Sequence, residues 1–313
     1  MIKDGAEARD ATEFEQHRRY LTGVAYRMLG SLADAEDAVQ DAYVRWHRAA
    51  PGATVENPRA YLARIVTRLC LDRMKSAQAR RETYVGPWLP EPIVGAASGT
   101  TPVAAADFEV ERANDISYAM LLMLERLSPL ERAAFLLHDV FDFDFEHIAE
   151  ILERSEESCR QLATRARGHI RGERPRFEAS VEARRRLAEA FTTATRTGDA
   201  SSLAAILAED VVFLSDGGGR VPAAINPILG RDHVSRMLAG LGQRWREQPQ
   251  IRYTFAEING LAGLIFYDGS KPFQTVALEA GEDGSIAAVY VVRNPEKLRH
   301  VPDFGEMSPA RIA

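Results

Sequence analysis

Apolar residues recur at intervals of three and four positions through much of the first 170 residues. Two clear stripes run from Tyr20 to Leu29 and from Tyr61 to Cys70, and each predicts an amphipathic helix with one buried face. Acidic side chains gather between them, beginning at Asp34, where they favour the positive amino-terminal end of a third helix. We therefore expect a helical bundle over about residues 13–78.

A stretch rich in proline and glycine interrupts this pattern at residues 86–102 (GPWLPEPIVGAASGTTP). Its composition favours a linker or an extended docking segment over a helix. Helical spacing returns at residues 116–127, and Ser128-Pro129 predicts the start of a further helix because proline fits the first helical turn.

Two short apolar stripes follow, at residues 148–152 and 159–170, with a break at Arg154-Ser155. Two short helices joined by a tight turn form the helix-turn-helix motif, so we expect that motif here. Just before it, residues 141–145 alternate phenylalanine with aspartate, which fits either a short strand or a turn.

The pattern changes after about residue 176. A helical stripe from Leu187 to Ala194 precedes runs rich in β-branched and aromatic residues, which begin at positions 211, 251, 261, 273 and 286. Turn sequences such as Asp268-Gly269 separate these runs, so we expect an α+β domain with an antiparallel sheet. The predicted fold class is multidomain, with two all-α domains followed by this α+β cone.

Charge is distributed in blocks, although the whole chain of 313 residues is acidic, with a net charge of −6. The average argues weakly against a nucleic-acid partner. Residues 59–81, however, hold seven basic side chains and one acid, and residues 154–176 hold seven arginines and three acids. Positive stretches of this kind suit contacts with phosphate groups.

The second half of the helix-turn-helix has the side chains of a recognition helix. Short polar and basic groups lie off its apolar stripe, where they can reach base edges in the major groove. These are Ser158, Arg160, Gln161, Thr164 and Arg165, with Arg167 placed for phosphates. A solvated, arginine-rich helix face fits the same pattern. The basic helix around Tyr61 suits single-stranded DNA, because such DNA binds positive charge through its phosphates and stacks its unpaired bases on aromatic rings. A solvated helix face fits this pattern too.

The cysteines, the missing catalytic motifs and the hydropathy argue against several classes of protein. The two cysteines, Cys70 and Cys159, lie far apart and outside any CxxC motif, so we expect neither a disulfide framework nor a zinc site. We find no P-loop, GxSxG or HExxH string, and predict no cofactor and no metal. No apolar run approaches the length of a membrane span and the first residues are polar; we expect a cytoplasmic protein with no membrane partner.

Three strings resemble conserved regions of the extracytoplasmic function (ECF) sigma factors. DAEDAVQDAYVRW, from Asp34 to Trp46, resembles the polymerase-binding helix of region 2, and NPRAYLARIVTRLCLDR, from Asn57 to Arg73, resembles the adjoining part that opens the minus-ten element. LSPLERAAFLLHDV at residues 127–140, together with residues 148–167, resembles region 4, which reads the minus-thirty-five element. The implied partners are core RNA polymerase, through its clamp helices and flap, and promoter DNA.

The resemblance also assigns residues. Those implied to face the polymerase are Asp34, Glu36, Asp37, Asp41 and Trp46. Those implied to contact the minus-ten strand are Asn57, Arg59, Tyr61, Arg64, Arg68 and Arg73. The recognition-helix residues named above would face the minus-thirty-five duplex. One departure is Arg68, since many ECF factors have asparagine there, and it leaves the base preference at that position open.

Three further strings resemble the sigma-factor-J-like subgroup, which has a C-terminal SnoaL-like domain of the NTF2 fold. They are WLPEP at 88–92, DGGG at 216–219 and NPEKL at 294–298. The implied domains are region 2 (10–82), a linker (83–106), region 4 (107–175), the SnoaL-like domain (176–301) and a tail (302–313). The implied regulatory contact places the linker on the SnoaL-like domain through Trp88, Leu89, Pro90, Glu91, Pro92, Asp216, Gly217, Gly218, Gly219, Asn294, Pro295, Lys297 and Leu298.

Two other functions remain open from the residues. SnoaL-like folds include isomerases and cyclases that use a cavity acid or a His/Asp pair, so an enzyme fused to a DNA-binding module is one alternative. Its candidate groups are Asp210, Asp216, Asp232, His233 and Asp268. Structural roles fit three of them, since Asp216 and Asp268 precede glycines at turns and Asp232 can cap a helix beginning at His233. The other alternative is a repressor that senses a ligand. In that case the SnoaL-like domain would bind a small ligand, whose chemical class the sequence does not identify. We expect no catalytic activity, because a fold does not by itself place a base against a substrate.

Overall fold

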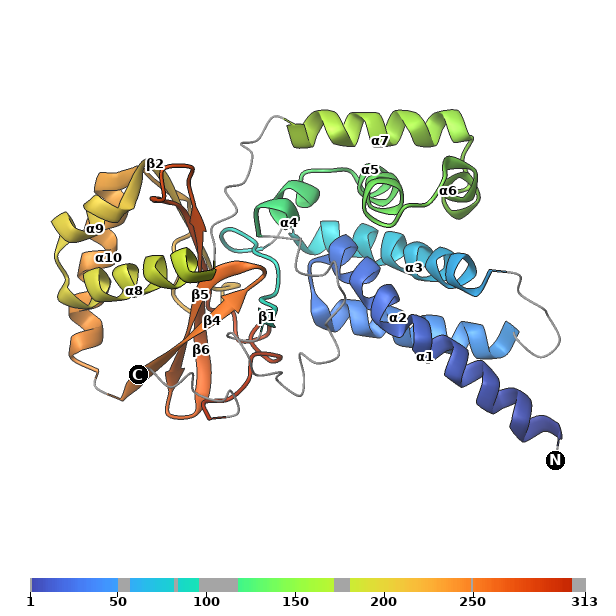
Figure 1. Cartoon of the computed structure of the whole chain (residues 1–313), viewed down its shortest axis with the longest axis horizontal. Coiled ribbons are helices and arrows are strands. Elements are labelled where there is room, and N and C mark those ends of the chain that lie inside the picture. The colour runs from blue at the N-terminus through green and yellow to red at the C-terminus, as the bar shows by residue number, and fades with distance from the viewer. Residues whose placement is uncertain are drawn as a thin grey trace. The chain divides into compact units, whose positions relative to one another are not determined.

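The computed structural model describes residues 2–49, 57–81, 84–95, 118–171, 181–248 and 250–305. They divide between two compact units, which are shown together in Figure 1. The first unit comprises residues 1–83, 110–113 and 119–174, and the second comprises residues 84–109, 114–118 and 175–313.

The first unit is helical. Its elements are α1 (Ile2–Leu29), α2 (Leu32–Ala49), α3 (Pro58–Arg81), α4 (Tyr118–Glu125), α5 (Pro129–Phe135), the π-helical turn η3 (Leu136–Val140), α6 (Phe145–Leu152) and α7 (Glu156–Arg171). The predicted apolar stripes of α1 and α3 are confirmed, because Leu21, Val24, Leu62 and Val66 have no exposed surface. Apolar burial on this scale is the main force that holds such helices together.

The predicted helix-turn-helix consists of α6 and α7. Residues 141–145 do not form a strand: Asp142 adopts a left-handed conformation with φ of 58°, and α6 begins at Phe145 after Asp144 caps it by accepting a hydrogen bond from the amide of His147. A side-chain cap of this kind satisfies an amide that lacks a partner within the helix. The turn interpretation is therefore right for this segment, and the strand interpretation is wrong.

Helix α5 begins with a complete capping box, and its removal should have a measurable cost. The hydroxyl of Ser128 accepts from the amide of Glu131, and the carboxylate of Glu131 accepts from the amide of Ser128. We expect Ser128→Ala to lower the free energy of unfolding by about 1 kcal/mol, since one amide loses its acceptor. Urea unfolding measures the change, and Ser155→Ala is the comparison, because the Ser155 hydroxyl accepts one bond of 3.3 Å at the start of α7. An unchanged stability would contradict the prediction.

The second unit is a cone of helices against one curved sheet. The helices are α8 (Val181–Thr197), α9 (Ala200–Ile206) and α10 (Arg231–Arg246), and the strands are β1 (Val94–Gly95), β2 (Leu207–Asp216), β3 (Ile228–Leu229), β4 (Ile251–Ile258), β5 (Leu261–Asp268), β6 (Lys271–Ala280) and β7 (Ile286–Val292). The strand order is β1-β4-β5-β6-β7-β2-β3. In Figure 1 the three helices lie against one face of the sheet, and the contacts of α8 with β5 and of α10 with β2 agree.

The expected antiparallel sheet needs one correction. Strands β2 and β7 pair in parallel, with Phe213 opposite Val289 and Ser215 opposite Val291, whereas the other neighbouring pairs are antiparallel. Parallel neighbours require a long crossover connection, and here the chain between them forms α10 and four other strands of the sheet. Such a pairing cannot be read from the period of one strand.

Both faces of the central strands are buried. Leu264 and Phe266 of β5 face the helical side and belong to the main apolar cluster, while Ile265 and Tyr267, on the opposite face, have no exposed surface either. Residues from outside the sheet cover that second face: Tyr118 stacks on Tyr290 at 5.1 Å, and Phe304 packs edge-on against Tyr267 at 5.2 Å. This double burial explains the continuous apolar sequence of β5, since a strand with one solvated face would alternate.

Two predicted turns have different outcomes. Asp268-Gly269 forms the expected hairpin between β5 and β6, and Gly269 has the positive φ of 62° that such a turn requires. Asp232 does not cap a helix at His233, because α10 already begins at Arg231 and follows Gly230. The main-chain oxygen of Asp232 instead accepts from the side chains of Ser235 and Arg236.

Candidate nucleic-acid interface and linker-binding site

The recognition helix α7 presents part of its predicted face to solvent. Gln161, Thr164 and Arg165 are exposed, whereas Cys159 and Leu162 on the other side are buried. The amphipathic sequence therefore orients the helix with its polar side chains outward. Arg165 keeps 61% of its side chain exposed and lies 3.5 Å from the carboxylate of Glu131.

Other polar groups of α7 already have partners. The Arg160 guanidinium contacts Glu156 at 2.6 Å and lies over the ring of Phe145. Arg167 makes two hydrogen bonds to the Asp139 carboxylate, at 2.8 and 3.1 Å. The Thr164 hydroxyl donates to the main-chain oxygen of Arg160, and Ser158 is half-buried.

On α3 the predicted minus-ten residues are held by neighbouring helices of the same unit. Asn57 accepts from the amide of Ala60 at the start of the helix. Arg59 lies over the ring of Tyr20 at 4.4 Å, and burial raises the pKa of the Tyr20 hydroxyl to about 12, against a smaller opposing effect of the Arg59 charge. Tyr61 and Arg64 are half-buried. An arginine over an aromatic face gains a cation–π attraction that restricts its position.

The predicted polymerase-binding residues on α2 fall into two groups. Glu36, Asp37 and Asp41 are exposed, and Asp34 is half-buried. The Arg73 guanidinium of α3 lies 2.7 Å from Asp41 and 3.8 Å from Asp37, so one predicted DNA contact pairs with two predicted polymerase contacts.

Trp46 does not lie on the acidic face of α2. Its side chain is only 3% exposed and packs against Tyr61 with ring centroids 5.7 Å apart. A ring buried in this way contributes to the core and not to an outer surface. Apolar burial places the ring inside the bundle, and its contact with the polymerase stays a prediction.

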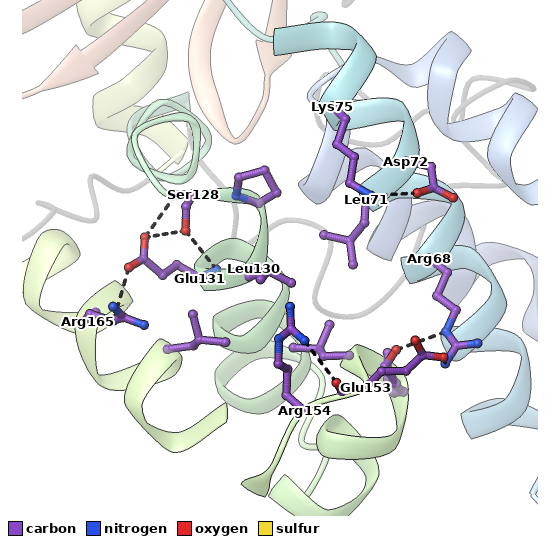
Figure 2. Close-up of a pocket in the computed structure, with 14 residues that line it drawn as sticks. Arg68, Leu71, Asp72, Lys75, Ser128, Leu130, Glu131, Glu153, Arg154 and Arg165 are labelled. Atoms are coloured by element: carbon purple, nitrogen blue, oxygen red, sulfur yellow. Dashed lines mark hydrogen bonds and ion pairs between the residues drawn. The ribbon is translucent and has the colours of Figure 1, made fainter. Parts of the chain in front are cut away.

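A cleft of about 710 Å³ separates α3 from helices α5 to α7 (Figure 2). At one end Arg68 reaches across it, with its guanidinium 2.5 Å from a carboxylate oxygen of Glu153 and 3.3 Å from the main-chain oxygen of Ile151. At the other end Glu131 joins Ser128 to Arg165. Burial raises the pKa of Glu131, but the hydrogen bonds from Ser128 and the nearby positive charges outweigh it and leave this pKa below its ordinary value.

A buried arginine joins α5 to α1. The Arg132 side chain is 2% exposed, and one of its nitrogens donates both to the main-chain oxygen of Met28 at 2.6 Å and to the Glu125 carboxylate at 2.7 Å. The carbonyl groups in the last turn of α1 lack partners inside the helix and form its negative end. A guanidinium at this point satisfies one of them.

In the second unit, Asp216 collects the linker and the carboxyl-terminal segment around one carboxylate. Asp216 has no exposed surface. Its oxygens accept from the Tyr84 hydroxyl at 2.5 Å, the Leu89 amide at 2.8 Å and the Lys297 ammonium at 2.8 Å. The amide of Gly218 adds a fourth bond at 3.0 Å. A buried carboxylate is costly unless it is paired and hydrogen-bonded, and here each of its oxygens accepts at least two hydrogen bonds.

Two aromatic rings of the linker surround the Lys297 ammonium. The nitrogen lies 4.0 Å from the ring centroid of Trp88 and 5.2 Å from that of Tyr84, and it also donates to the main-chain oxygen of Leu89. Burial, followed by the hydrogen bond to Asp216, raises the pKa of the Tyr84 hydroxyl well above its usual range. A cation enclosed by aromatic faces and one carboxylate is bound strongly because little water competes.

The other residues of the three strings also lie around this carboxylate, which we call the Asp216 cluster. Asn294 donates to the Tyr84 hydroxyl, and its side-chain nitrogen lies 2.3 Å from where a Cβ on Gly218 would be, at a φ of 60° that suits glycine. Pro90, Glu91, Pro92, Gly217 and Leu298 are buried, whereas Gly219 and Pro295 are exposed.

The helical sigma regions and the chain as a whole match known proteins in sequence. The Sigma-70 region 2 family matches residues 14–80, and the Sigma-70 region 4 family matches residues 117–170. The ECF RNA polymerase sigma factor SigJ of Mycobacterium tuberculosis is 37% identical over 300 residues, which cover 94% of each chain. The chain belongs to the ECF RNA polymerase sigma factors. A probable ECF sigma factor of the same species, SigI, is 38% identical over 90% of this sigma factor and 92% of its own length.

The fold of this sigma factor agrees with that assignment. The crystal structure of the M. tuberculosis sigma factor SigJ superposes with a TM-score of 0.72 at 35% identity and covers 93% of this chain and 98% of that one. Two helical sigma regions are followed by a mixed domain of the SnoaL-like type, as the sequence predicts.

Sequence reasoning missed several residues of the linker-binding site in the sigma factor. Tyr84 precedes the WLPEP string, yet it binds both Asp216 and Asn294. The segment after the string forms β1, which pairs with β4, and Asn259 exchanges hydrogen bonds with Ile93. Tyr118 donates to the main-chain oxygen of Pro90. The available signal was Tyr84 before WLPEP and Ile93 and Val94 after it, since apolar residues in a proline-rich segment indicate docking.

Most of the candidate catalytic residues lie on the surface of the second unit. Asp210, Asp232, His233 and Asp268 are exposed, and the remaining acid, Asp216, is engaged by the linker as described above. Within the described ranges, no group of three or more His, Cys, Asp or Glu side chains is arranged to hold a metal ion. No helix of the described part of the chain has the length and apolar character to span a bilayer.

Proposed function

We propose that this sigma factor binds core RNA polymerase, directs it to a specific set of promoters and helps to open the minus-ten element. The observation that carries the proposal is the exposed polar face of α7, which has glutamine, threonine and arginine side chains above a buried apolar stripe. Helices with this arrangement read base edges in the major groove, while arginines at the margin contact phosphates.

The remaining surfaces of the first unit receive matching roles. The arginines of α3, with Tyr61, are suited to a melted strand, because positive charge binds its phosphates and an aromatic ring stacks on an unpaired base. The exposed acids of α2, Glu36, Asp37 and Asp41, are suited to a basic surface of the polymerase. Polymerase and DNA contacts would then lie on adjacent helices of one bundle.

The Asp216 cluster supports a regulatory role for the SnoaL-like domain. It binds the linker that joins the two sigma regions, through Tyr84, Trp88 and Leu89. The length of chain free to connect the regions therefore depends on whether this contact is made. Regulation through the linker needs no catalytic reaction and no cofactor.

Transcription with purified components tests the function. Start sites mapped after overexpression provide the promoter, and run-off transcription with core polymerase and the full chain should yield a product that core polymerase alone does not. Binding to duplex DNA without polymerase would indicate a repressor, and turnover of a small substrate would indicate an enzyme; either result without run-off product would contradict the proposal.

The recognition face of α7 can be tested on the same promoter. We expect Gln161→Ala and Arg165→Ala each to lower promoter binding by the holoenzyme about tenfold, because a good contact with a base edge contributes about 1–3 kcal/mol. A filter-binding assay at fixed salt measures the loss. Arg185→Ala removes a comparably exposed arginine from α8 and should leave binding unchanged; equal losses in all three variants would contradict sequence reading by α7.

A further inference from the structure

In this structure the Arg68 side chain contacts region 4, and it cannot bind DNA while it does so. It belongs to the predicted minus-ten surface of region 2, yet its guanidinium contacts the carboxyl end of α6 in region 4. We propose that Arg68 is a latch on the α3 side that helps to keep regions 2 and 4 together in the free sigma factor and must be released before the regions separate on the polymerase. This inference rests on the proposed function.

The geometry is that of a helix cap supplied by another region. Arg68 Nε donates to the main-chain oxygen of Ile151 at 3.3 Å, and Nη2 donates to that of Glu150 at 3.4 Å. Carbonyl groups in the last turn of a helix lack internal partners and carry its negative partial charge. The planar guanidinium has several donors and can satisfy two of them while it also binds a carboxylate.

The residue that follows α6 adds the third contact. Glu153 Oε1 lies 2.5 Å from Arg68 Nη2, and Glu153 has a left-handed backbone with φ of 55° and ψ of 49°. Glycine is the usual residue at this point, since other residues are strained there by about 1–2 kcal/mol. The strained backbone directs a carboxylate to Arg68. This ion pair explains why a glutamate occupies a position that favours glycine.

Between α3 and helices α5 to α7 the boundary is a cleft, whereas α1 packs against region 4 through Tyr20 on Phe141 at 5.2 Å and through the buried Arg132. Leu71 and Lys75 of α3 line one side, and Leu162 and Arg165 of α7 line the other, around a volume of about 710 Å³ (Figure 2). The polar contact of Arg68 therefore closes one end of a boundary that buries little apolar surface at this place. This part of the boundary can open at low cost in hydrophobic free energy.

The chemistry makes the two states of Arg68 mutually exclusive. One guanidinium cannot cap α6 and lie along a melted strand at the same time.

The test weakens the latch from the α6 side and measures binding of the full chain to core polymerase without DNA. Glu153→Asn removes the carboxylate, and asparagine tolerates the left-handed backbone. A partly exposed ion pair changes an equilibrium by about fivefold, and apparent affinity scales with the fraction of molecules that are open. We expect Glu153→Asn, and likewise Glu153→Gly, to bind core polymerase about fivefold more tightly.

Two controls decide the interpretation. Glu150→Gln removes one negative charge from the same helix while keeping the main-chain oxygen that Arg68 contacts, and it should bind like the unmodified chain. In an Arg68→Ala background, Glu153→Asn should have no further effect, because no latch remains to be broken. An effect of Glu153→Asn that equals that of Glu150→Gln, or that persists without Arg68, would overturn the latch. Failure of the unmodified chain to bind core polymerase would instead overturn the proposed function.

Discussion

Asp216→Asn should release the linker from the SnoaL-like domain. Asparagine keeps the size of the side chain but removes the charge that balances Lys297, and it presents an NH₂ group to donors such as the Leu89 amide. Removing one partner of a buried pair typically costs about 3–5 kcal/mol. We expect the exchange protection of the Leu89 amide to fall by about 100-fold or more, and regulation of transcription to be lost with it.

Hydrogen exchange of the full chain, followed by mass spectrometry of the linker peptide, measures this release. The matched control is Asp303→Asn, which breaks an ion pair of similar length, 2.6 Å, whose lysine is 76% exposed. The exposed pair should matter little. The double variant Asp216→Asn/Lys297→Met should be less damaged than Asp216→Asn alone, since no buried charge is left unpaired. Unchanged protection at Leu89 in Asp216→Asn would refute the role of the Asp216 cluster in linker binding.

Arg132→Ala should be the most destabilising single change in the first unit. It leaves the Glu125 carboxylate, which is 15% exposed, without the guanidinium that neutralises it and removes a donor from the main-chain oxygen of Met28. It also creates a cavity in place of the largest fully buried side chain. The expected loss in free energy of unfolding is about 3–5 kcal/mol.

Denaturant unfolding followed by circular dichroism provides the measurement. Arg18→Ala is the control, because Arg18 and Glu15 lie at the same separation of 2.7 Å in α1 but are 44% and 54% exposed. Its cost should stay below about 1 kcal/mol. Equal losses for the two variants would show that burial does not determine the strength of the Arg132 contact.

Local patterns predicted the helices of this sigma factor because their period is set by the backbone. The stripes around Leu21 and Leu62 mark buried faces without any knowledge of what covers them. The start of α5 was equally visible, since Ser128 and Pro129 act within one turn. Information of this kind is contained in a few neighbouring residues.

Contacts between distant segments were beyond that reasoning. Arg132 and Met28 are 104 positions apart, and nothing near Arg132 indicates that it will be buried against another helix. The family resemblance assigned Trp46 to the polymerase-binding surface, although its own face of the helix points inward. The parallel pairing of β2 with β7 likewise depends on the path of the whole domain.

The candidate sites were predictable to different degrees. Resemblance between short strings indicated Trp88, Asp216 and Lys297 as one group, and the structure brings these three side chains together. The strings could not supply Tyr84, which lies outside them, or the partners that Arg68 finds in α6. Polar contacts across regions have no periodicity and appear only once the fold is known.

The strand β1 has a consequence for synthesis of the chain on the ribosome. Ile93, just before β1, can form its hydrogen bond only after Asn259 has been synthesised, 166 positions later in the chain. At about 5–20 residues per second, translation takes on the order of ten seconds or more to cover that distance. Both DNA-binding regions are therefore completed before the linker can be captured, and each newly made molecule passes through an interval in which the SnoaL-like domain does not yet control it.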